Sequence, residues 1–185
     1  MTRACKVALL GAECTGKSSL TTLLGLRLAP LRAATVGEYL REWCVQNGRT
    51  PQQHEQAQIA AEQAYRVAAA ARRHPLVVAD TTPLMTAFYS IHYFQDDSGL
   101  AAAVAEQRQF DLTLLCAPGG IPWQADGWIR ESPAVRLQAH DELLALLQAQ
   151  RLPFTLLSGP LDERAALAEM LIRSLPALRG AHASG

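Results

Sequence analysis

Eight consecutive residues near the start of the chain have the types and spacing of a phosphate-binding loop. They read Gly11-Ala12-Glu13-Cys14-Thr15-Gly16-Lys17-Ser18, which fits the pattern G-x-x-x-x-G-K-S/T at every fixed position. Glycines let such a loop curl so that its backbone N–H groups converge on an anion, and a following helix adds the positive end of its dipole. Lys17 would reach the β- and γ-phosphates of a nucleoside triphosphate, with the Ser18 hydroxyl on Mg²⁺. We include Ser19 among the nucleotide-binding residues.

Two variable positions of this loop carry reactive side chains. Cys14 is either a tolerated small residue, which we favour, or a nucleophile whose thiol pKa is lowered by the helix N-terminus. Glu13 needs Mg²⁺ or a lysine nearby to be tolerated so close to bound phosphates. Both stay among the predicted nucleotide-binding residues.

Two acidic residues that follow apolar runs could serve the same site. Asp80 ends the run Leu76-Val77-Val78-Ala79, where a carboxylate can hold Mg²⁺ or simply cap a strand end for solvation. Glu38 follows a run that ends at Val36, where a carboxylate could accept the proton of a substrate hydroxyl that attacks the γ-phosphorus. The alternative for Glu38 is a glutamate favoured at a helix start by the helix dipole. We expect Asp80 beside the metal and Glu38 as the general base.

Residues near Glu38 could bind the substrate that accepts the phosphoryl group. Arg41 and Glu42 share a helical face with Glu38, so they either orient the substrate or form a solvated charge pair. Six aromatic side chains could stack on the aromatic base of a nucleoside. Aromatic residues at helical spacing are more typical of a hydrophobic core, so none of the six is assigned to such a contact. They are Tyr39, Trp43, Tyr65, Phe88, Tyr89 and Tyr93.

A segment rich in proline, glycine and tryptophan interrupts the chain after Cys116. It contains Trp123, Asp126 and Arg130. As a mobile lid it would place Arg130 over the triphosphate and exclude water. The alternative is a packed loop in which tryptophan is a hydrophobic plug.

The elements that must position these residues alternate between strands and helices. Apolar runs predict strands over 5–10, 33–36, 75–80, 110–116 and 153–157, and helical patterns span 17–28, 52–73, 84–94, 101–109, 135–150 and 161–175, with a turn or helix start at 37–43. Such alternation predicts an α/β fold with a parallel sheet, helices on both faces and right-handed crossovers. Ligands bind beyond the carboxyl ends of such strands, so the phosphate-binding loop, Glu38 and Asp80 should share one edge.

The composition favours a single domain with a small-molecule partner. The 185 residues suit one domain over 1–176 with a flexible tail over 177–185. Because 17 basic and 17 acidic residues cancel without runs of like charge, we expect neither a nucleic-acid nor a membrane partner. The four cysteines form no C-x-x-C pair, and no signal peptide or membrane-spanning stretch is found, which predicts a cytoplasmic protein. The sequence does not indicate an oligomeric state.

Several motifs occur in a fixed order over residues 5–175. They are the phosphate-binding loop, Glu38-Tyr39-Leu40-Arg41-Glu42, Asp80-Thr81-Thr82, and Phe110-Asp111-Leu112 leading to Pro122-Trp123-Gln124-Ala125-Asp126-Gly127. Together they resemble the ribosylnicotinamide kinase domain of the NadR type, a P-loop kinase of NAD salvage. The resemblance implies a three-layer P-loop NTPase sandwich with a five-stranded parallel sheet and a lid, which uses ATP and Mg²⁺ to phosphorylate the 5′-hydroxyl of nicotinamide riboside.

By that resemblance, particular residues acquire roles. Catalysis would involve Lys17, Glu38, Asp80 and Arg130, with Ser18 and Asp80 at the metal, and substrate contacts would come from Glu38, Tyr39, Arg41, Glu42, Asp80, Trp123 and Asp126. The chain departs from the family at the lid, where one extra residue precedes Arg130, and at Thr82 and Gly37, where relatives often carry an acid and an aromatic residue. A kinase of another nucleoside or nucleotide, and an ATP-binding regulatory module with little turnover, remain as alternatives.

Overall fold

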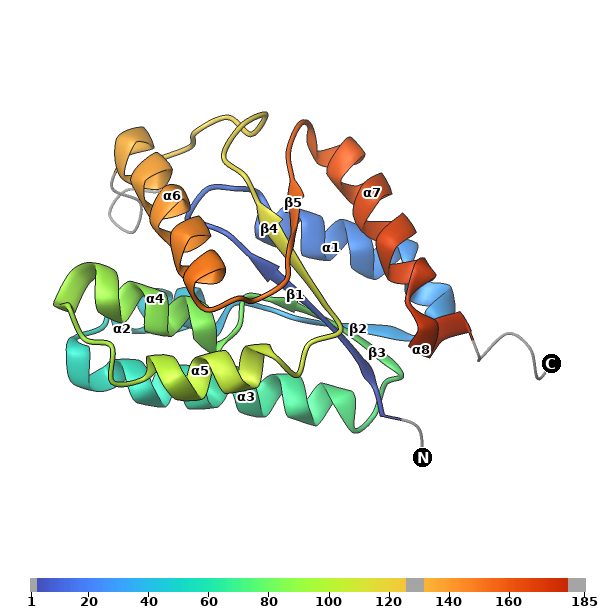
Figure 1. The fold of residues 1–185 in the computed structure, drawn as a ribbon, viewed down its shortest axis with the longest axis horizontal. Helices are drawn as coiled ribbons and strands as arrows, with labels where there is room; N and C mark the ends of the chain where they lie inside the picture. Colours follow the sequence, from blue (N-terminus) through green and yellow to red (C-terminus); the bar gives the residue numbers. More distant parts are fainter. Residues whose placement is uncertain (1–2, 126–131, 180–185) are drawn as a thin grey trace.

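The computed structural model describes residues 3–125 and 132–179 (Figure 1). Within these residues the chain forms a five-stranded, all-parallel sheet in the order β2-β3-β1-β4-β5. The strands are β1 (Cys5–Leu10), β2 (Ala33–Val36), β3 (Leu76–Asp80), β4 (Leu112–Cys116) and β5 (Thr155–Leu157). The predicted α/β class, a P-loop NTPase sandwich with a central parallel sheet, is confirmed.

Helices connect the strands and cover both faces of the sheet (Figure 1). They are α1 (Lys17–Arg27), α2 (Tyr39–Asn47), α3 (Gln56–Ala71), α4 (Pro83–Phe94), α5 (Leu100–Gln107), α6 (Pro133–Ala149), α7 (Leu161–Ser174) and α8 (Pro176–Arg179), with short 3₁₀ turns η1 (Ala29–Leu31) and η2 (Gln53–Glu55). Buried residues of α1 and α7 pack on one face, and those of α3, α4, α5 and α6 pack on the other.

Alternate residues of the central strand β1 belong to two different cores. Val7 and Leu9 pack with α1 and α7, whereas Ala8 and Leu10 pack with α4 and α6. Because neither face meets water, the strand is a nearly continuous apolar run. The register pairs Leu9 with Asp80, so β1 and β3 end side by side at the carboxyl edge of the sheet.

Several boundaries differ from those expected. β4 begins at Leu112 rather than Phe110, because the Phe110 N–H closes the turn after α5 by donating to the Gln107 carbonyl oxygen. β5 begins at Thr155 rather than Pro153, and proline has no N–H to contribute to a sheet. Residues 53–55, expected to be α-helical, form the 3₁₀ turn η2 before α3 begins.

A short helix lies at the start of the expected tail. Residues 176–179 form α8, and Leu178 is buried against the core that α1 and α7 share. The flexibility expected over 177–185 stays a prediction. Residues 180–185 lie outside the described residues, as do Asp126 and Arg130 of the predicted lid.

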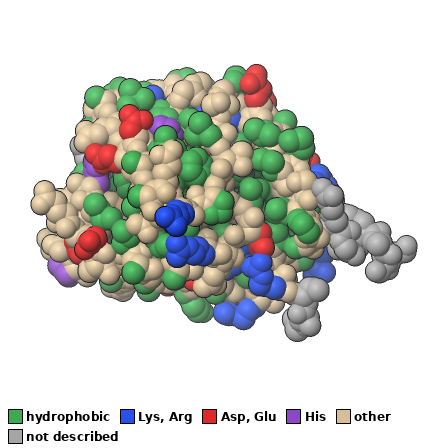
Figure 2. All heavy atoms as spheres, viewed as in Figure 1, with side chains coloured by type: hydrophobic (Ala, Val, Ile, Leu, Met, Phe, Trp, Pro, Cys, Tyr) green, Lys and Arg blue, Asp and Glu red, His purple; other side chains and the backbone are tan. Residues whose placement is uncertain are grey.

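The surface and the helices carry two further observations. On the face shown in Figure 2, acidic and basic side chains both occur among apolar and neutral ones. In the part of the chain that the structure describes, no helix combines the length and the apolar character needed to cross a membrane.

Candidate active site

The phosphate-binding loop (residues 11–18) lies between β1 and α1 at the carboxyl edge of the sheet. Gly11 has a φ of 152°, and a Cβ there would lie 2.8 Å from both the Cys116 carbonyl oxygen and the Thr15 hydroxyl. Gly16 precedes α1 with a φ of 79°. Both positions therefore need glycine, one for space and one for its left-handed backbone. The Thr15 hydroxyl donates to the Ala12 carbonyl oxygen at 2.8 Å and closes the curl.

Lys17 is buried against the inside of this loop. Its side chain is only 6% exposed, and its ammonium donates to the carbonyl oxygens of Gly11 at 2.8 Å and Ala12 at 2.9 Å. A buried ammonium needs acceptors, and two carbonyls satisfy it weakly compared with phosphate oxygens. The lysine is thus held ready for an anion in the loop.

Asp80 lies beside the loop at the end of β3. It is 2% exposed, and its Oδ1 has no hydrogen-bond partner within the described residues. Burial raises the pKa of this carboxyl, and the charge of Lys17 and the Ser18 hydroxyl oppose that rise. An unused buried carboxylate oxygen near a hydroxyl is an all-oxygen donor set, which suits Mg²⁺. Ser18 and Asp80 therefore fit the predicted metal.

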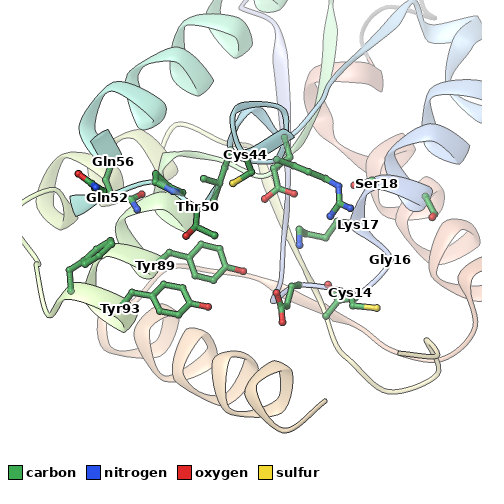
Figure 3. Close-up of a pocket in the computed structure, with 18 residues that line it drawn as sticks. Cys14, Gly16, Lys17, Ser18, Cys44, Thr50, Gln52, Gln56, Tyr89 and Tyr93 are labelled. Atoms are coloured by element: carbon green, nitrogen blue, oxygen red, sulfur yellow. The ribbon is translucent and has the colours of Figure 1, made fainter. Parts of the chain in front are cut away.

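A cavity of about 670 Å³ opens from the loop toward α2 and α4 (Figure 3). One end of this cavity is formed by residues 13–19, which include Lys17 and Ser18. Its other lining residues come from α2 and its N-cap, the segment before α3, and α4. They are Glu38, Leu40, Arg41, Cys44, Thr50, Pro51, Gln52, Gln56, Tyr89, Tyr93 and Phe94. The structure thus brings Glu38 and Arg41 into one cavity with the phosphate-binding loop.

Glu38 is the N-cap residue of α2, but its side chain makes no capping hydrogen bond to the described backbone. Its position at the start of α2 also fits the alternative of a glutamate favoured there by the helix dipole. The Glu38 charge acts on side chains that line the cavity. Burial, and after it the negative charge of Glu38, raises the pKa of Cys44 to about 11. Burial and then Glu38 also raise the pKa of Tyr89 well above its usual range.

Other members of the predicted substrate set lie away from this cavity. The Glu42 carboxylate accepts a hydrogen bond from Arg66 of α3 at 2.6 Å, and the Arg66 guanidinium lies 4.4 Å from the centre of the Tyr39 ring. Both residues therefore join α2 to α3. Trp123 is half-buried and lies 5.5 Å from the guanidinium of Arg136 on α6. None of these three is among the described residues that line the cavity.

Two tyrosines that the sequence patterns left unassigned line the cavity on the side of α4. Figure 3 shows the rings of Tyr89 and Tyr93 extending together from α4 toward the phosphate-binding loop. Their centroids are 5.9 Å apart with planes 20° from parallel. Phe88, one residue earlier, is 3% exposed and belongs to the core. The sequence carries one signal for this pair: two tyrosines spaced i, i+4 on the helical face next to a phenylalanine that faces the core.

Arg164 of α7, which no motif singled out, secures the outside of the loop. It is 1% exposed and donates to the carbonyl oxygens of Thr15 at 3.1 Å, Gly159 at 2.7 Å, and Gly119. A loop that presents N–H groups to an anion must turn its carbonyls elsewhere, and a buried cation satisfies them. Arg164 therefore holds the loop against the segments that follow β4 and β5.

Arg136 of α6 does the same one residue earlier. One of its Nη atoms donates to the carbonyl oxygens of Cys14 and Ile121, each at 3.1 Å. The Cys14 sulfur in turn accepts the Gln124 N–H at 3.3 Å. The described start of the predicted lid is therefore attached to the phosphate-binding loop through Cys14.

A family model described as an AAA domain matches residues 6–164. The chain belongs to this AAA-domain family. The matched range includes the phosphate-binding loop, Glu38, Asp80, Arg136 and Arg164. A search of curated proteins finds no match to the chain.

Solved structures share the fold. NadR protein in complex with NR superposes with a TM-score of 0.73 at 19% identity, over 93% of this chain and 51% of that one. NadR in complex with NAD and AMP-PNP gives 0.70 at 18%, over 93% and 49%. Thymidylate kinase from Candida albicans gives 0.63 at 12%, over 96% and 95%. The chain spans about half the length of the NadR chains, and its resemblance to their kinase-type P-loop fold is confirmed.

Replacing Arg164 should destabilise the folded protein. Arg164→Met leaves three carbonyl groups without their donor, which should lower the free energy of unfolding by about 2–4 kcal/mol in urea titrations. Arg173→Met, which removes an exposed ion pair with Glu169 on the same helix, should cost no more than about 1 kcal/mol. Equal stability of the two variants would contradict this account of Arg164.

Replacing Asp80 should stabilise the folded protein at neutral pH. Because the pKa of Asp80 is raised on folding, its contribution to stability is present below the unfolded pKa of about 3.9 and is lost as pH rises through the folded pKa. Asp80→Asn should therefore unfold at a higher temperature than wild type at pH 7, with the difference shrinking toward pH 4. Asp141→Asn, at an exposed position, is the control and should change nothing. An unfolding temperature of Asp80→Asn below that of wild type at pH 7 would contradict a raised pKa for Asp80.

Proposed function

We propose that this protein is an ATP-dependent nucleoside kinase that phosphorylates the 5′-hydroxyl of nicotinamide riboside. The observation that carries the proposal is the single cavity lined by Lys17 and Ser18 at one end and by Glu38, Tyr89 and Tyr93 beyond it. Such a cavity has room for both a phosphate donor and an aromatic acceptor. The fold shared with NadR and thymidylate kinase supports the same class of reaction.

The donor end would hold the triphosphate of ATP. The loop's N–H groups and the Lys17 ammonium would bind its phosphate oxygens, and Lys17 would exchange its two carbonyl acceptors for them. Ser18 and Asp80 would hold Mg²⁺, which when bound neutralises charge on the β- and γ-phosphates. The raised pKa of Asp80 would fall as positive charge arrives.

The acceptor end would supply the base. As the 5′-oxygen of the riboside attacks the γ-phosphorus, the bond from that phosphorus to the β,γ-bridging oxygen breaks and ADP leaves. The Glu38 carboxylate takes the proton of the attacking hydroxyl. Arg41, which lines the same cavity, adds positive charge where the transferred phosphoryl group carries negative charge.

The wall of the cavity that Tyr89 and Tyr93 form suits a positively charged nucleobase. The nicotinamide ring of the riboside is a pyridinium, which is attracted to the faces of tyrosine rings and to carboxylates. Tyr89 and Tyr93 offer stacked rings, and Glu13 and Glu38 line the same cavity. A neutral base such as thymine would gain the stacking but not the charge interaction.

The decisive measurement is phosphoryl transfer from ATP across a panel of nucleosides. We expect nicotinamide riboside to give the highest kcat/KM, and both Lys17→Ala and Glu38→Gln to lower it by about 10²–10⁴-fold. Glu42→Gln is the matched control for Glu38→Gln, since Glu42 pairs with Arg66 outside the cavity. If phosphate is transferred only to a different nucleoside, nicotinamide riboside is not the substrate. ATP binding with no transfer to any nucleoside would favour the regulatory module.

Removing the Tyr93 ring should weaken binding of the nucleoside but not binding of ATP. Tyr93 is 48% exposed, so Tyr93→Ala should fold normally. We expect it to raise KM for the nucleoside by about 10-fold through lost stacking and cation–π attraction, with kcat and KM for ATP nearly unchanged. Tyr65→Ala, which removes an exposed tyrosine of α3, is the control. A rise in KM for ATP instead would mean that Tyr93 lies at the nucleotide.

A further inference from the structure

Gln63 of α3 contacts both of the segments that carry the acidic residues of the site. It is 1% exposed. Its Oε1 accepts the Tyr39 N–H at 2.8 Å, and its Nε2 donates to the carbonyl oxygens of Gly37 and Thr81, each at 3.3 Å. A single amide thus uses its acceptor and its donor group on three backbone groups of two different loops.

The three partners flank the two acids. Gly37 and Tyr39 are the neighbours of Glu38 on either side, and Thr81 directly follows Asp80. The ladder between β2 and β3 ends with the pair Val36 and Ala79, just before the acids. The Gln63 amide therefore continues the connection between these segments at the point where backbone pairing ends.

Thr81 needs such support because its backbone is strained. It has a φ of 73°, which is rare for a β-branched residue. Its N–H donates to the Leu9 carbonyl oxygen at 3.0 Å, and its own carbonyl accepts from Gln63. Strain of this kind persists only where surrounding contacts fix the backbone, and here it follows the carboxylate predicted at the metal.

We propose that Gln63 is a positioning residue that fixes the separation and orientation of Glu38 and Asp80. This role rests on the proposed function, in which both carboxylates serve one phosphoryl group. Gln63 does not belong to the described residues that line the cavity, so it acts through the backbone beside each acid. An amide is required, because only a group that both accepts and donates can bond the Tyr39 N–H and the two carbonyl oxygens at once.

The test replaces Gln63 with methionine, which keeps the length and removes every hydrogen bond. With wild-type transfer established on the nucleoside panel, we expect Gln63→Met to lower kcat by about 10²-fold while KM for ATP and for the nucleoside changes less than about 3-fold. The acidic limb of the kcat–pH profile, which reports the base, should shift. Hydrogen exchange of the Tyr39 amide should accelerate, which reports loss of the contact independently of activity.

Gln107→Met is the matched control. Gln107 is also a buried glutamine, 2% exposed, and its amide bonds the Thr82 and Thr113 hydroxyls instead of the backbone beside the acids. It should lose comparable stability with kcat and the pH profile little changed. If Gln63→Met does not fold, Gln63→Glu replaces it, since this variant keeps the acceptor for Tyr39 and loses both donors, with the same expected loss of kcat.

The outcomes separate the two proposals. Wild-type transfer combined with a Gln63→Met kcat within about 3-fold of wild type, despite faster exchange at Tyr39, overturns the positioning role and leaves the kinase proposal intact. An equal fall of kcat in Gln107→Met also overturns it, because stability alone would then explain the loss. A wild-type protein that transfers phosphate to no nucleoside overturns the proposed function, and the role of Gln63 with it.

Discussion

Burial of both faces of the parallel sheet is the constraint on which the rest of this structure depends. Residues of β1 alternate between two apolar cores, so its interior cannot hold unpaired polar groups. Chemistry is confined to the edge where the strands end, and the register places Leu9 beside Asp80 there. The phosphate-binding loop and the buried carboxylate are neighbours because their strands are neighbours, although more than sixty residues separate them in the chain.

Cationic side chains stabilise the loop at this edge from both sides. Lys17 binds the carbonyls of Gly11 and Ala12 from within, and the carbonyls of Cys14 and Thr15 are bound by Arg136 and Arg164 from α6 and α7. With these carbonyls satisfied, the N–H groups of the loop are left to face an anion. The lysine is the exchangeable member of this set, because it alone lines the cavity.

The two ends of the cavity have different origins in the chain. The donor end comes from one contiguous motif, and membership of the AAA-domain family agrees with it. The other end is assembled from α2, the segment before α3, and α4, and the Gln63 amide bonds the backbone on both sides of its lining residue Glu38. In the proposed function, one cavity would hold both the phosphate donor and the acceptor.

The sequence by itself determined the order of the strands along the chain, most of the helices, the phosphate-binding loop and the strand-end positions of Glu38 and Asp80, because period, glycine spacing and strand-end acids are local patterns. It could not determine which face of α2 meets the cavity, so Tyr39 and Glu42 were expected at the substrate although they contact Arg66. Nor could it find Arg164 or Gln63. Their partners are brought near only by the strand order β2-β3-β1-β4-β5, which depends on packing across the whole sheet.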